Sequence, residues 1–337
     1  CPRQANDFDL NKDSKEKELS REKWLDLVEE AADLGIKKFN LEGGGEPTAA
    51  PDLVFPVMEK IKEQEMYGIV TTNGTLLDEE RIKWLVEIDW DRIHFSIDSP
   101  QAETHDRLRK RKGAFEKSIQ NIRFLNKWKE KLGKENPMLN LNIVINKKNF
   151  DKLPEMVELA SELNADYIFT EPLIVFSDAG KKLKISSPSE KKKLKKSKEK
   201  AKRLAEKYGI DNNFGTEDQN LEEDLVEDTS NMRDLLKEIP SGDGHDILSS
   251  PCLKPWRLMS IKYDGKTGHC GLIQRGDSVE KKSLEDVWYG KRMEDVRDKM
   301  SDGELLEHCD NCVPSDVTQR KRFRKNLIEK LEEEGLT

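Results

Sequence analysis

The chain has 337 residues, of which 35% are apolar and 37% charged, and its formal net charge at pH 7 is −8. This length allows one large domain, or a large one with a smaller one, and the surface must be heavily charged. The negative net charge argues against nucleic acid as the main partner, because phosphate binding needs a basic face. No apolar run approaches the roughly 20 residues that span a bilayer, and no secretory leader is visible. We therefore expect a cytoplasmic protein without a membrane partner.

The first half of the chain alternates between strand and helix patterns. Short apolar segments predict strands at 38–41, 67–72, 92–97, 139–145 and 167–170. Between them, apolar residues recur at helical spacing, beginning with Trp24, Leu27, Val28, Ala31 and Leu34 before the stop at Gly35. Strands that alternate with helices run parallel, so the sequence predicts an α/β sheet or barrel.

Two of these strands alternate polar and apolar residues. His94 and Ser96 do so in one strand, and Asn140 and Asn142 in another. Strands buried on both faces of a parallel sheet read instead as continuous apolar runs. The alternation indicates a polar inner face, as in a barrel that holds a ligand, and the alternative is an edge strand facing solvent. Asn140, Asn142 and His94 indicate a polar ligand, whereas the favoured interpretation of His94 is a core histidine whose hydrogen bonds are satisfied.

The later part of the chain changes in composition. Residues 186–208 predict a lysine-rich helix, whose apolar stripe favours a solvated amphipathic face over nucleic-acid binding. Residues 211–250 are acidic and are interpreted as a linker with one short helix near 232–236. The predicted organisation is a core at 1–210, this acidic linker, and a small cysteine-rich domain with a C-terminal helix at 251–337.

A glycine-rich turn follows the first predicted strand, with the sequence Gly43-Gly44-Gly45-Glu46-Pro47. Three glycines let the backbone turn sharply and approach a ligand closely, and Glu46 would place a negative charge beside it. A phosphate loop is disfavoured, because Glu46 would repel phosphate and no Gly-Lys-Ser/Thr sequence follows. A plain tight turn is the remaining alternative.

Polar residues also follow the next two strands. Thr71 and Asn73 end one of them, and Ser96 and Asp98 end the other. The C-terminal ends of strands are where α/β barrels and open α/β sheets bind ligands. Asp98 is well placed to accept hydrogen bonds from a ribose diol.

Five cysteines complete the candidate residues, namely Cys1, Cys252, Cys270, Cys309 and Cys312. In a long acidic chain without a secretory leader they indicate metal ligands rather than disulfides. The last four could hold either a tetrahedral zinc ion or a [4Fe–4S] cluster, and spacing alone does not separate these.

Taken together and in their order along the chain, these motifs resemble those of the radical S-adenosylmethionine (SAM) superfamily. The resemblance rests on Gly44-Gly45-Glu46-Pro47, residues 71–74 and 96–98, His105-Asp106-Arg107, Gly113-Ala114-Phe115 and Asn149. It implies a partial (β/α)6 TIM-type barrel in which the glycine-rich segment binds the amino group of SAM. The implied SAM-binding residues are Gly44, Gly45, Glu46, Pro47, Thr71, Asn73, Ser96, Asp98 and Asn142. SAM itself could also be the polar ligand that Asn140, Asn142 and His94 indicate.

The C-terminal cysteines resemble the SPASM/twitch extension of the same superfamily. Cys252 and Cys270 with Gly265 between them, followed by Trp288, Arg297 and the Cys309–Cys312 pair, carry this resemblance. A full SPASM domain has seven cysteines and two clusters, so four cysteines are similar to the shorter twitch form. This implies one auxiliary [4Fe–4S] cluster held by Cys252, Cys270, Cys309 and Cys312.

The sequence departs from the superfamily in its CxxxCxxC motif. Only Cys1, followed by Pro2-Arg3-Gln4, can be the third cysteine of that motif. We therefore expect the other two cysteines and the first barrel strand to lie upstream of residue 1. Three thiolates are needed to hold the catalytic cluster, so the chain as numbered is expected to be inactive.

The resemblance implies that the intact protein cleaves SAM reductively. The resulting 5′-deoxyadenosyl radical would abstract a hydrogen atom from a peptide, a cofactor precursor or a small molecule, with Cys1 among the ligands of the catalytic cluster. A ferredoxin or flavodoxin is the expected electron donor. Two alternatives remain, a non-catalytic α/β binding protein with a structural zinc site and a different barrel enzyme with an incidental glycine turn.

Overall fold

The computed structural model describes residues 18–43, 45–175, 177–215, 250–271, 276–306 and 309. The chain forms two compact units. Unit 1 contains Ser20–Gly215, and unit 2 contains Thr216–Thr337 together with Glu16–Leu19.

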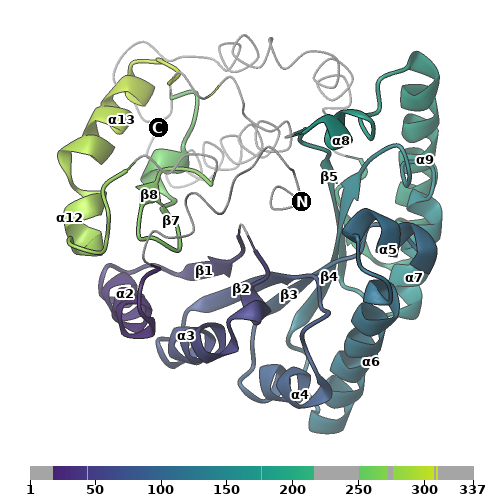
Figure 1. Cartoon of the computed structure of the whole chain (residues 1–337), viewed down its shortest axis with the longest axis horizontal. Helices are drawn as coiled ribbons and strands as arrows, with labels where there is room; N and C mark the ends of the chain where they lie inside the picture. The colour runs from purple at the N-terminus through teal and green to yellow at the C-terminus, as the bar shows by residue number, and fades with distance from the viewer. Residues whose placement is uncertain are drawn as a thin grey trace, which may run out of the picture. The chain divides into compact units, whose positions relative to one another are not determined.

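Unit 1 is built on a six-stranded parallel sheet in which every strand pairs with the one before it (Figure 1). The strands are β1 (Lys38–Leu41), β2 (Tyr67–Thr72), β3 (Arg92–Ser96), β4 (Met138–Ile145), β5 (Tyr167–Pro172) and β6 (Asp211–Asn212). The order β1-β2-β3-β4-β5-β6 and the curvature of the sheet are those of a partial TIM-type barrel, as the sequence predicts. All five predicted strands are present, and β6 is additional.

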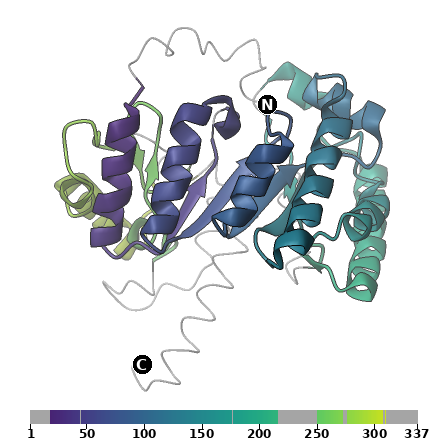
Figure 2. The same ribbon diagram turned by 90° about the horizontal axis from the view of Figure 1, so that it is seen from below.

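Helices connect the strands and line the outer face of the curved sheet (Figures 1 and 2). They are α2 (Arg21–Asp33), α3 (Pro51–Glu63), α4 (Glu79–Glu87), α5 (Ala102–Arg109), α6 (Ala114–Leu132), α7 (Leu153–Glu162), α8 (Asp178–Lys181) and α9 (Pro188–Tyr208). Several begin at a side chain that accepts a backbone hydrogen bond, such as Ser20 at α2 and Asp78 at α4. The start of α9 is a full capping box between Ser187 and Glu190.

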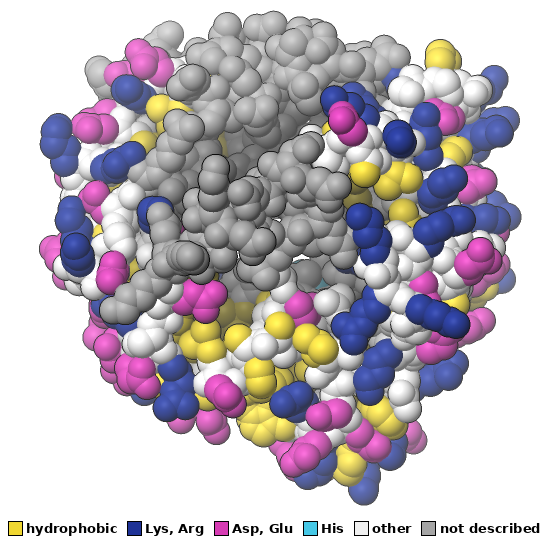
Figure 3. All heavy atoms as spheres, in the orientation of Figure 1, with side chains coloured by type: hydrophobic (Ala, Val, Ile, Leu, Met, Phe, Trp, Pro, Cys, Tyr) yellow, Lys and Arg dark blue, Asp and Glu magenta, His cyan; other side chains and the backbone are white. Residues whose placement is uncertain are grey.

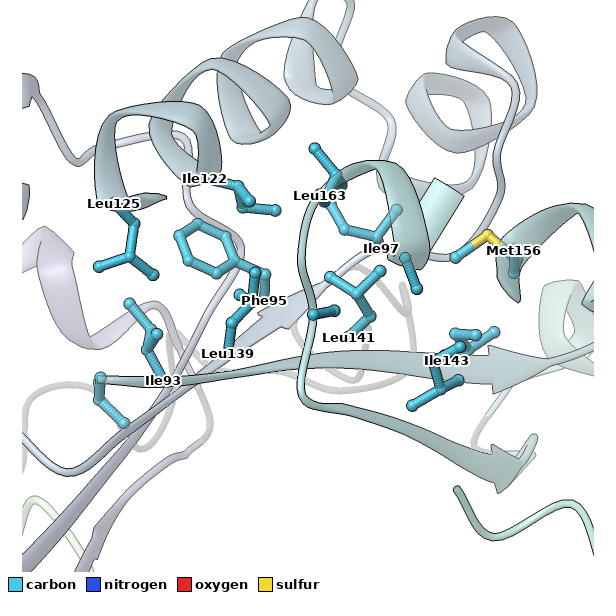
Figure 4. Close-up of a cluster of buried hydrophobic side chains, with 14 of the residues drawn as sticks. Ile93, Phe95, Ile97, Ile122, Leu125, Leu139, Leu141, Ile143, Met156 and Leu163 are labelled. Carbon is cyan, nitrogen blue, oxygen red and sulfur yellow. The ribbon is translucent and has the colours of Figure 1, made fainter. Parts of the chain in front are cut away.

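The hydrophobic core lies between the sheet and these outer helices. Figure 4 shows Ile93, Phe95 and Ile97 beside Leu139, Leu141 and Ile143, facing side chains from α6 and α7. The polar residues between them in sequence, including His94 and Asn140, therefore lie on the inner face. Because β3 and β4 both have strands on either side, the edge-strand alternative is wrong. The prediction of a polar inner face is confirmed.

The sheet continues past the predicted end of the core at residue 210. Asp211 and Asn212 pair with β5, and the side-chain oxygen of Asn213 accepts hydrogen bonds from the backbone and hydroxyl of Thr170. These residues belong to the sheet, although the sequence assigned them to the linker. Most of that linker, with its short helix near 232–236, lies outside the described residues, and the domain boundaries remain a prediction.

The lysine-rich helix α9 is amphipathic, as predicted. On α9, the side chains of Ser197, Ala201 and Ala205 are buried within unit 1, and most of the basic side chains are exposed. Figure 3 shows Lys and Arg side chains gathered on the side where Figure 1 places α9, with Asp and Glu among them. No helix of the described ranges is both long and apolar enough to cross a lipid bilayer.

Unit 2 is smaller, and its described part consists of short elements. A hairpin of β7 (Ser260–Ile261) and β8 (Thr267–Gly268) turns at Gly265, whose φ of +80° favours glycine. It is preceded by the 3-10 helix η5 (Lys254–Trp256) and followed by α12 (Leu284–Trp288) and α13 (Lys291–Ser301). The predicted C-terminal helix falls outside the described residues.

Candidate functional site

The carboxyl ends of the strands of unit 1 bring the predicted ligand-binding residues together. Register pairs Leu41 with Val70, Thr72 with Phe95, and Ser96 with Asn142 across neighbouring strands. The glycine-rich turn, the 71–75 segment and the 96–98 segment therefore follow adjacent strands at one edge of the sheet. Cys1 and Gly44 lie outside the described residues.

The carboxylate of Glu46 joins two of these strand ends. Its Oε1 accepts hydrogen bonds from the Thr48 backbone at 3.2 Å, the Thr48 hydroxyl at 2.6 Å and the Thr72 hydroxyl at 2.6 Å. Its Oε2 accepts one from the Asn73 backbone at 2.7 Å. Glu46 also caps the 3-10 helix η2 (Pro47–Ala49), which holds Pro47. The carboxylate thus braces the glycine turn against the end of β2, and its direct contact with a ligand remains a prediction.

The segment after β2 is fixed by buried polar residues of α6. Ser118 donates its hydroxyl proton to the Asn73 carbonyl at 2.6 Å, and Asn121 donates to the Gly74 carbonyl at 2.7 Å. The Asn73 side chain accepts from the backbone and hydroxyl of Thr75, so it is used within its own turn. Sequence reasoning missed Ser118 and Asn121, although polar residues on the buried stripe of a helix are a recognisable pattern.

Asp98 has a different environment from the one predicted. It is 6% exposed, its Oδ1 accepts a hydrogen bond from the Val144 backbone at 3.1 Å, and its Oδ2 lies 2.7 Å from Nε of Arg109. Asn149 donates to the Asp98 carbonyl at 2.7 Å, and the Asp98 backbone donates to Nδ1 of His105 at 3.2 Å. Both carboxylate oxygens are therefore engaged within the protein. This geometry supports a brace between β3, β4 and α5, and the ribose contact remains a prediction.

Ser96 and Asn142 lie side by side on the inner face, one at the end of β3 and one within β4. Asn142 Nδ2 is 3.4 Å from Nδ1 of His94, whereas its Oδ1 is buried without a hydrogen-bond partner. Thr71 is also on this face, with its hydroxyl 3.4 Å from the same Nδ1. A hydroxyl and an unpaired amide oxygen at paired positions of adjacent strands fit the hydroxyl groups of a ribose.

His94 differs from its predicted role. Its Nε2 is buried without a partner, so it is not a satisfied core histidine. Burial, with a smaller contribution from the nearby Arg92 guanidinium, lowers its pKa to about 4. The imidazole is therefore neutral at pH 7.

The cysteines of unit 2 occupy connecting segments. Cys252 is buried beside Ser250, and Cys270 follows β8, where the Ser260 hydroxyl donates to its carbonyl at 2.9 Å. Arg297 holds the segment after Cys252, donating to the Pro255 carbonyl at 3.1 Å and stacking on the Trp288 ring at 4.4 Å. Thiolates of this kind suit iron–sulfur clusters or zinc. Within the described ranges no three potential metal ligands gather, and Cys312 lies outside them.

The fold is that of an α/β protein with a partial barrel, which has a polar inner face and candidate ligand-binding residues at the carboxyl ends of its strands. Residues 1–160 match the model of the radical SAM superfamily, and residues 252–313 match SPASM, an iron–sulfur cluster-binding domain. The chain therefore contains a radical SAM domain and a SPASM region. These two domains imply SAM and iron–sulfur clusters as its cofactors.

Curated relatives are similar over the first half of the chain. The PqqA peptide cyclase of Granulibacter bethesdensis is 32% identical over 166 residues, which are 49% of this chain and 41% of that protein. The AdoMet-dependent heme synthase of Methanosarcina barkeri is 33% identical over 148 residues, which are 44% of this chain and 40% of that protein. The chain thus spans less than half the length of these relatives, which are both enzymes.

Solved structures share the fold over most of the chain. Streptococcus suis SuiB bound to S-adenosylmethionine superimposes with a TM-score of 0.61 at 17% identity, covering 83% of this chain and 61% of SuiB. Native anSMEcpe with bound AdoMet gives a TM-score of 0.56 at 17% identity, covering 87% of this chain and 77% of that one. At such low identity these structures support the architecture alone.

Proposed function

We propose that this protein is a radical SAM enzyme that cleaves SAM reductively and abstracts a hydrogen atom from its substrate. When bound, a [4Fe–4S] cluster would supply the electron that yields methionine and the 5′-deoxyadenosyl radical. The observation that carries the proposal is the Ser96–Asn142 pair on the inner face, beside the turn braced by Glu46, in a chain that matches both domain models.

The residues of unit 1 have distinct parts in this proposal. Gly45, with Gly44 and Pro47 in the same turn, would present backbone groups to the methionine end of SAM, while Glu46 holds the turn in place. Ser96 and Asn142 would bind the ribose hydroxyls. Asp98 would keep the ends of β3 and β4 at the correct separation, because its carboxylate accepts a hydrogen bond from the Val144 backbone in β4, while its ion pair with Arg109 holds α5 beside them.

A peptide is the substrate class we favour. The name of the cyclase relative refers to the peptide PqqA, SuiB has been solved with its precursor peptide SuiA, and anSMEcpe with the Kp18Cys peptide. The heme synthase relative supports a cofactor precursor as the second possibility. The test substrates are therefore short peptides first and tetrapyrroles second.

The auxiliary site would hold one [4Fe–4S] cluster on Cys252, Cys270, Cys309 and Cys312. Four thiolates leave no iron open to substrate, so this cluster would transfer electrons rather than bind the substrate. A ferredoxin or flavodoxin in the cytoplasm would supply the reducing electron. Nucleic acid and membranes are not expected partners.

The test is to express the protein with its whole cysteine motif without oxygen, reconstitute it with iron and sulfide, and count iron per chain. We expect about eight irons, falling to about four when Cys309 and Cys312 are both replaced by Ala. Reduction with dithionite should then convert SAM to 5′-deoxyadenosine and methionine. One tightly held zinc ion with no iron would contradict the proposal and leave a zinc-stabilised binding protein.

A further inference from the structure

The connections at the carboxyl edge of the sheet differ in charge from one half of the sheet to the other. The segments after β1 and β2, residues 42–52 and 73–80, contain six acidic residues and no basic one. The segment from the end of α5 to the start of α6, residues 107–112, contains five basic residues and no acidic one. Residues 147–152 after β4 and 178–184 after β5 add six basic residues against two acidic ones. The β3–β5 half is therefore basic, although the net charge of the chain is −8.

Hydrogen bonds join these three basic connections to one another. The side chain of Asn149 donates to the Asp98 carbonyl at 2.7 Å, which ties the segment after β4 to the one after β3. The Lys147 backbone donates to the Leu183 carbonyl at 2.9 Å, which ties the segment after β4 to the one after β5. The three connections therefore form one continuous surface.

This surface lies at the same edge of the sheet as the strand-end residues. Arg111 donates to the hydroxyl of Thr75, in the turn after β2, at 3.0 Å. Figure 3 shows Lys and Arg side chains gathered over the part of the molecule where Figure 1 places α5 and α8. A chain bound to this surface would therefore lie beside the strand ends.

Several acidic side chains of the region are already engaged by the protein and do not neutralise the surface. Asp98 is paired with Arg109. Asp106 uses both of its carboxylate oxygens to accept from the backbones of Gly113 and Phe115, at 2.6 and 2.9 Å. These carboxylates hold the connection between α5 and α6 in place, and the exposed charges around them remain basic.

Five exposed basic residues of the three connections have no ion pair with any other described residue. We call them the basic rim: Arg107, Lys110, Lys112, Lys148 and Lys182. The exposed carboxylates without an ion pair in the same part of the described chain are Glu103, Glu116 and Asp151. Cations thus outnumber anions, and the positive charge of the rim is available to a partner.

The spread of the basic rim indicates an extended partner. β3 and β5 are two strand spacings apart, which is about 10 Å. A single carboxylate or phosphate is too small to contact side chains from all three connections. An extended peptide advances about 3.3 Å per residue, so about four residues cross this span and can present several carboxylates to it.

Two other classes of polyanion fit the surface less well. Single-stranded nucleic acid is bound by aromatic side chains on which its bases stack, and Phe150, the one aromatic residue of the three connections, is buried. A folded acidic protein covers about 800 Å² of its partner and would also meet the acidic segments after β1 and β2. An extended acidic peptide can follow the basic half alone.

We propose that the basic rim binds an acidic segment of the substrate peptide and holds it beside the strand ends. Attraction between the rim and the carboxylates of the peptide would also speed their encounter. The inference rests on the proposed function only in taking the bound peptide to be the substrate.

The experiment titrates a fluorescein-labelled oligoglutamate peptide with the full chain and measures fluorescence anisotropy. Oligoglutamine of the same length is the neutral probe. We expect oligoglutamate to bind about tenfold more tightly at low salt, and this difference to shrink as NaCl screens the charges. The rim variant, Lys110→Glu with Lys112→Glu and Lys182→Glu, should bind oligoglutamate about tenfold more weakly than the wild type. Equal binding of the two probes by the wild type would overturn the proposal.

A matched control carries Lys193→Glu, Lys196→Glu and Lys200→Glu at exposed positions of α9, with the same change in net charge. Its affinity for oligoglutamate should stay within about threefold of the wild type, because it leaves the rim intact. A loss as large as that of the rim variant would overturn the proposal, since any lysine-rich surface would then attract the probe. Replacing the three rim lysines by Gln should give an intermediate loss, and wild-type affinity in both rim variants would contradict the rim.

Cleavage of SAM by the reconstituted protein with its whole cysteine motif separates this inference from the proposed function. None of the three substituted rim lysines is assigned to SAM, so conversion of SAM to 5′-deoxyadenosine with dithionite should match the wild type. Normal cleavage without oligoglutamate binding overturns the rim alone. Oligoglutamate binding to the rim without cleavage by the wild type supports the rim and overturns the proposed function.

Two further outcomes would replace the peptide by another partner. Tighter binding of oligodeoxythymidylate than of oligoglutamate would overturn the proposal in favour of nucleic acid. A rim variant that keeps its affinity for oligoglutamate but is no longer reduced by flavodoxin would overturn it in favour of the electron donor.

Discussion

At the strand ends, several side chains hold neighbouring backbone segments together. Glu46 accepts four hydrogen bonds from its own turn and from β2, and Asp98 is engaged by Val144 and Arg109. Ser96 and Asn142 retain atoms directed to the inner face. The charged side chains Glu46 and Asp98 therefore fix the positions of backbone segments. In our proposal the neutral side chains Ser96 and Asn142 contact the ligand.

Replacing Glu46 by Gln tests this bracing role. An amide can keep the three hydrogen bonds on one oxygen, but its NH₂ group would then face the Asn73 backbone N–H. We expect the free energy of unfolding to fall by about 1–3 kcal/mol, because a charge-assisted bond is lost and a donor is left unpaired. Urea unfolding measures the change, and Glu59→Gln, at an exposed position of α3, should stay within about 0.5 kcal/mol of wild type.

The lowered pKa of His94 makes stability depend on pH. The folded protein holds this imidazole neutral down to about pH 4, whereas the unfolded chain takes up a proton near pH 6.5. The unfolded state thus binds more protons between these values, and stability falls as the pH drops through this window. From pH 7 to pH 5 the loss from His94 is about 2 kcal/mol, and His94→Gln should remove it. Equal losses in both proteins, in urea unfolding at the two pH values, would contradict this assignment.

At the scale of elements, the strand-to-helix connections depend on close packing. Gly74, in the turn between β2 and α4, has a φ of +71°, and a Cβ atom there would lie 2.5 Å from Cε1 of Phe95. We expect Gly74→Ala to cost about 2–4 kcal/mol from backbone strain and overpacking together. Gly133→Ala is the matched control, since Gly133 has a φ of +62° but open space around it, and should cost about 1 kcal/mol. Similar losses for both would show that Phe95 can move aside.

The elements that the sequence predicted correctly are those with a strong period. α2, with its stop at Gly35, and the five strands from β1 to β5 are all present. The two-residue strand β6 was missed because Asp211 and Asn212 have no apolar pattern, and they are defined only by pairing with β5. The helix α5 was missed because its apolar residues are few, although it supplies Arg109.

The candidate site likewise has some features that local sequence predicts and others that it does not. Strand-end position is a property of local sequence, so Asn73 and Ser96 could be placed in advance at the ends of β2 and β3, whereas their contact with a ligand remains a prediction. The engagement of Asp98 by Arg109 and Val144 depends on partners 11 and 46 residues away, which no local pattern reveals. The unpaired Nε2 of His94 likewise becomes visible only when the neighbouring strands are placed.

At the scale of the whole molecule, ligand binding should have a defined footprint. S-adenosylhomocysteine, which lacks the reactive sulfonium, should slow amide hydrogen exchange most in the 71–75, 96–99 and 142–149 segments, because a bound ligand suppresses the local opening of the segments that it contacts. Amides of α9, on the outer face, should be unaffected (Figure 1). Exchange measured by mass spectrometry with and without the ligand checks this. Unchanged exchange in these three segments, at a ligand concentration that raises the Tm of the protein, would mean that the ligand does not bind at the strand ends.

The strictly sequential order of the sheet has a consequence for how the protein is made. Each strand from β2 to β6 pairs with the strand synthesised just before it. On the ribosome, a newly emerged strand therefore finds its partner already exposed at the growing edge, and no gap must be held open for a later segment. Pairing between near neighbours in sequence also keeps the loops short that must close. Unit 1 can thus assemble in the direction of translation, one strand and helix at a time.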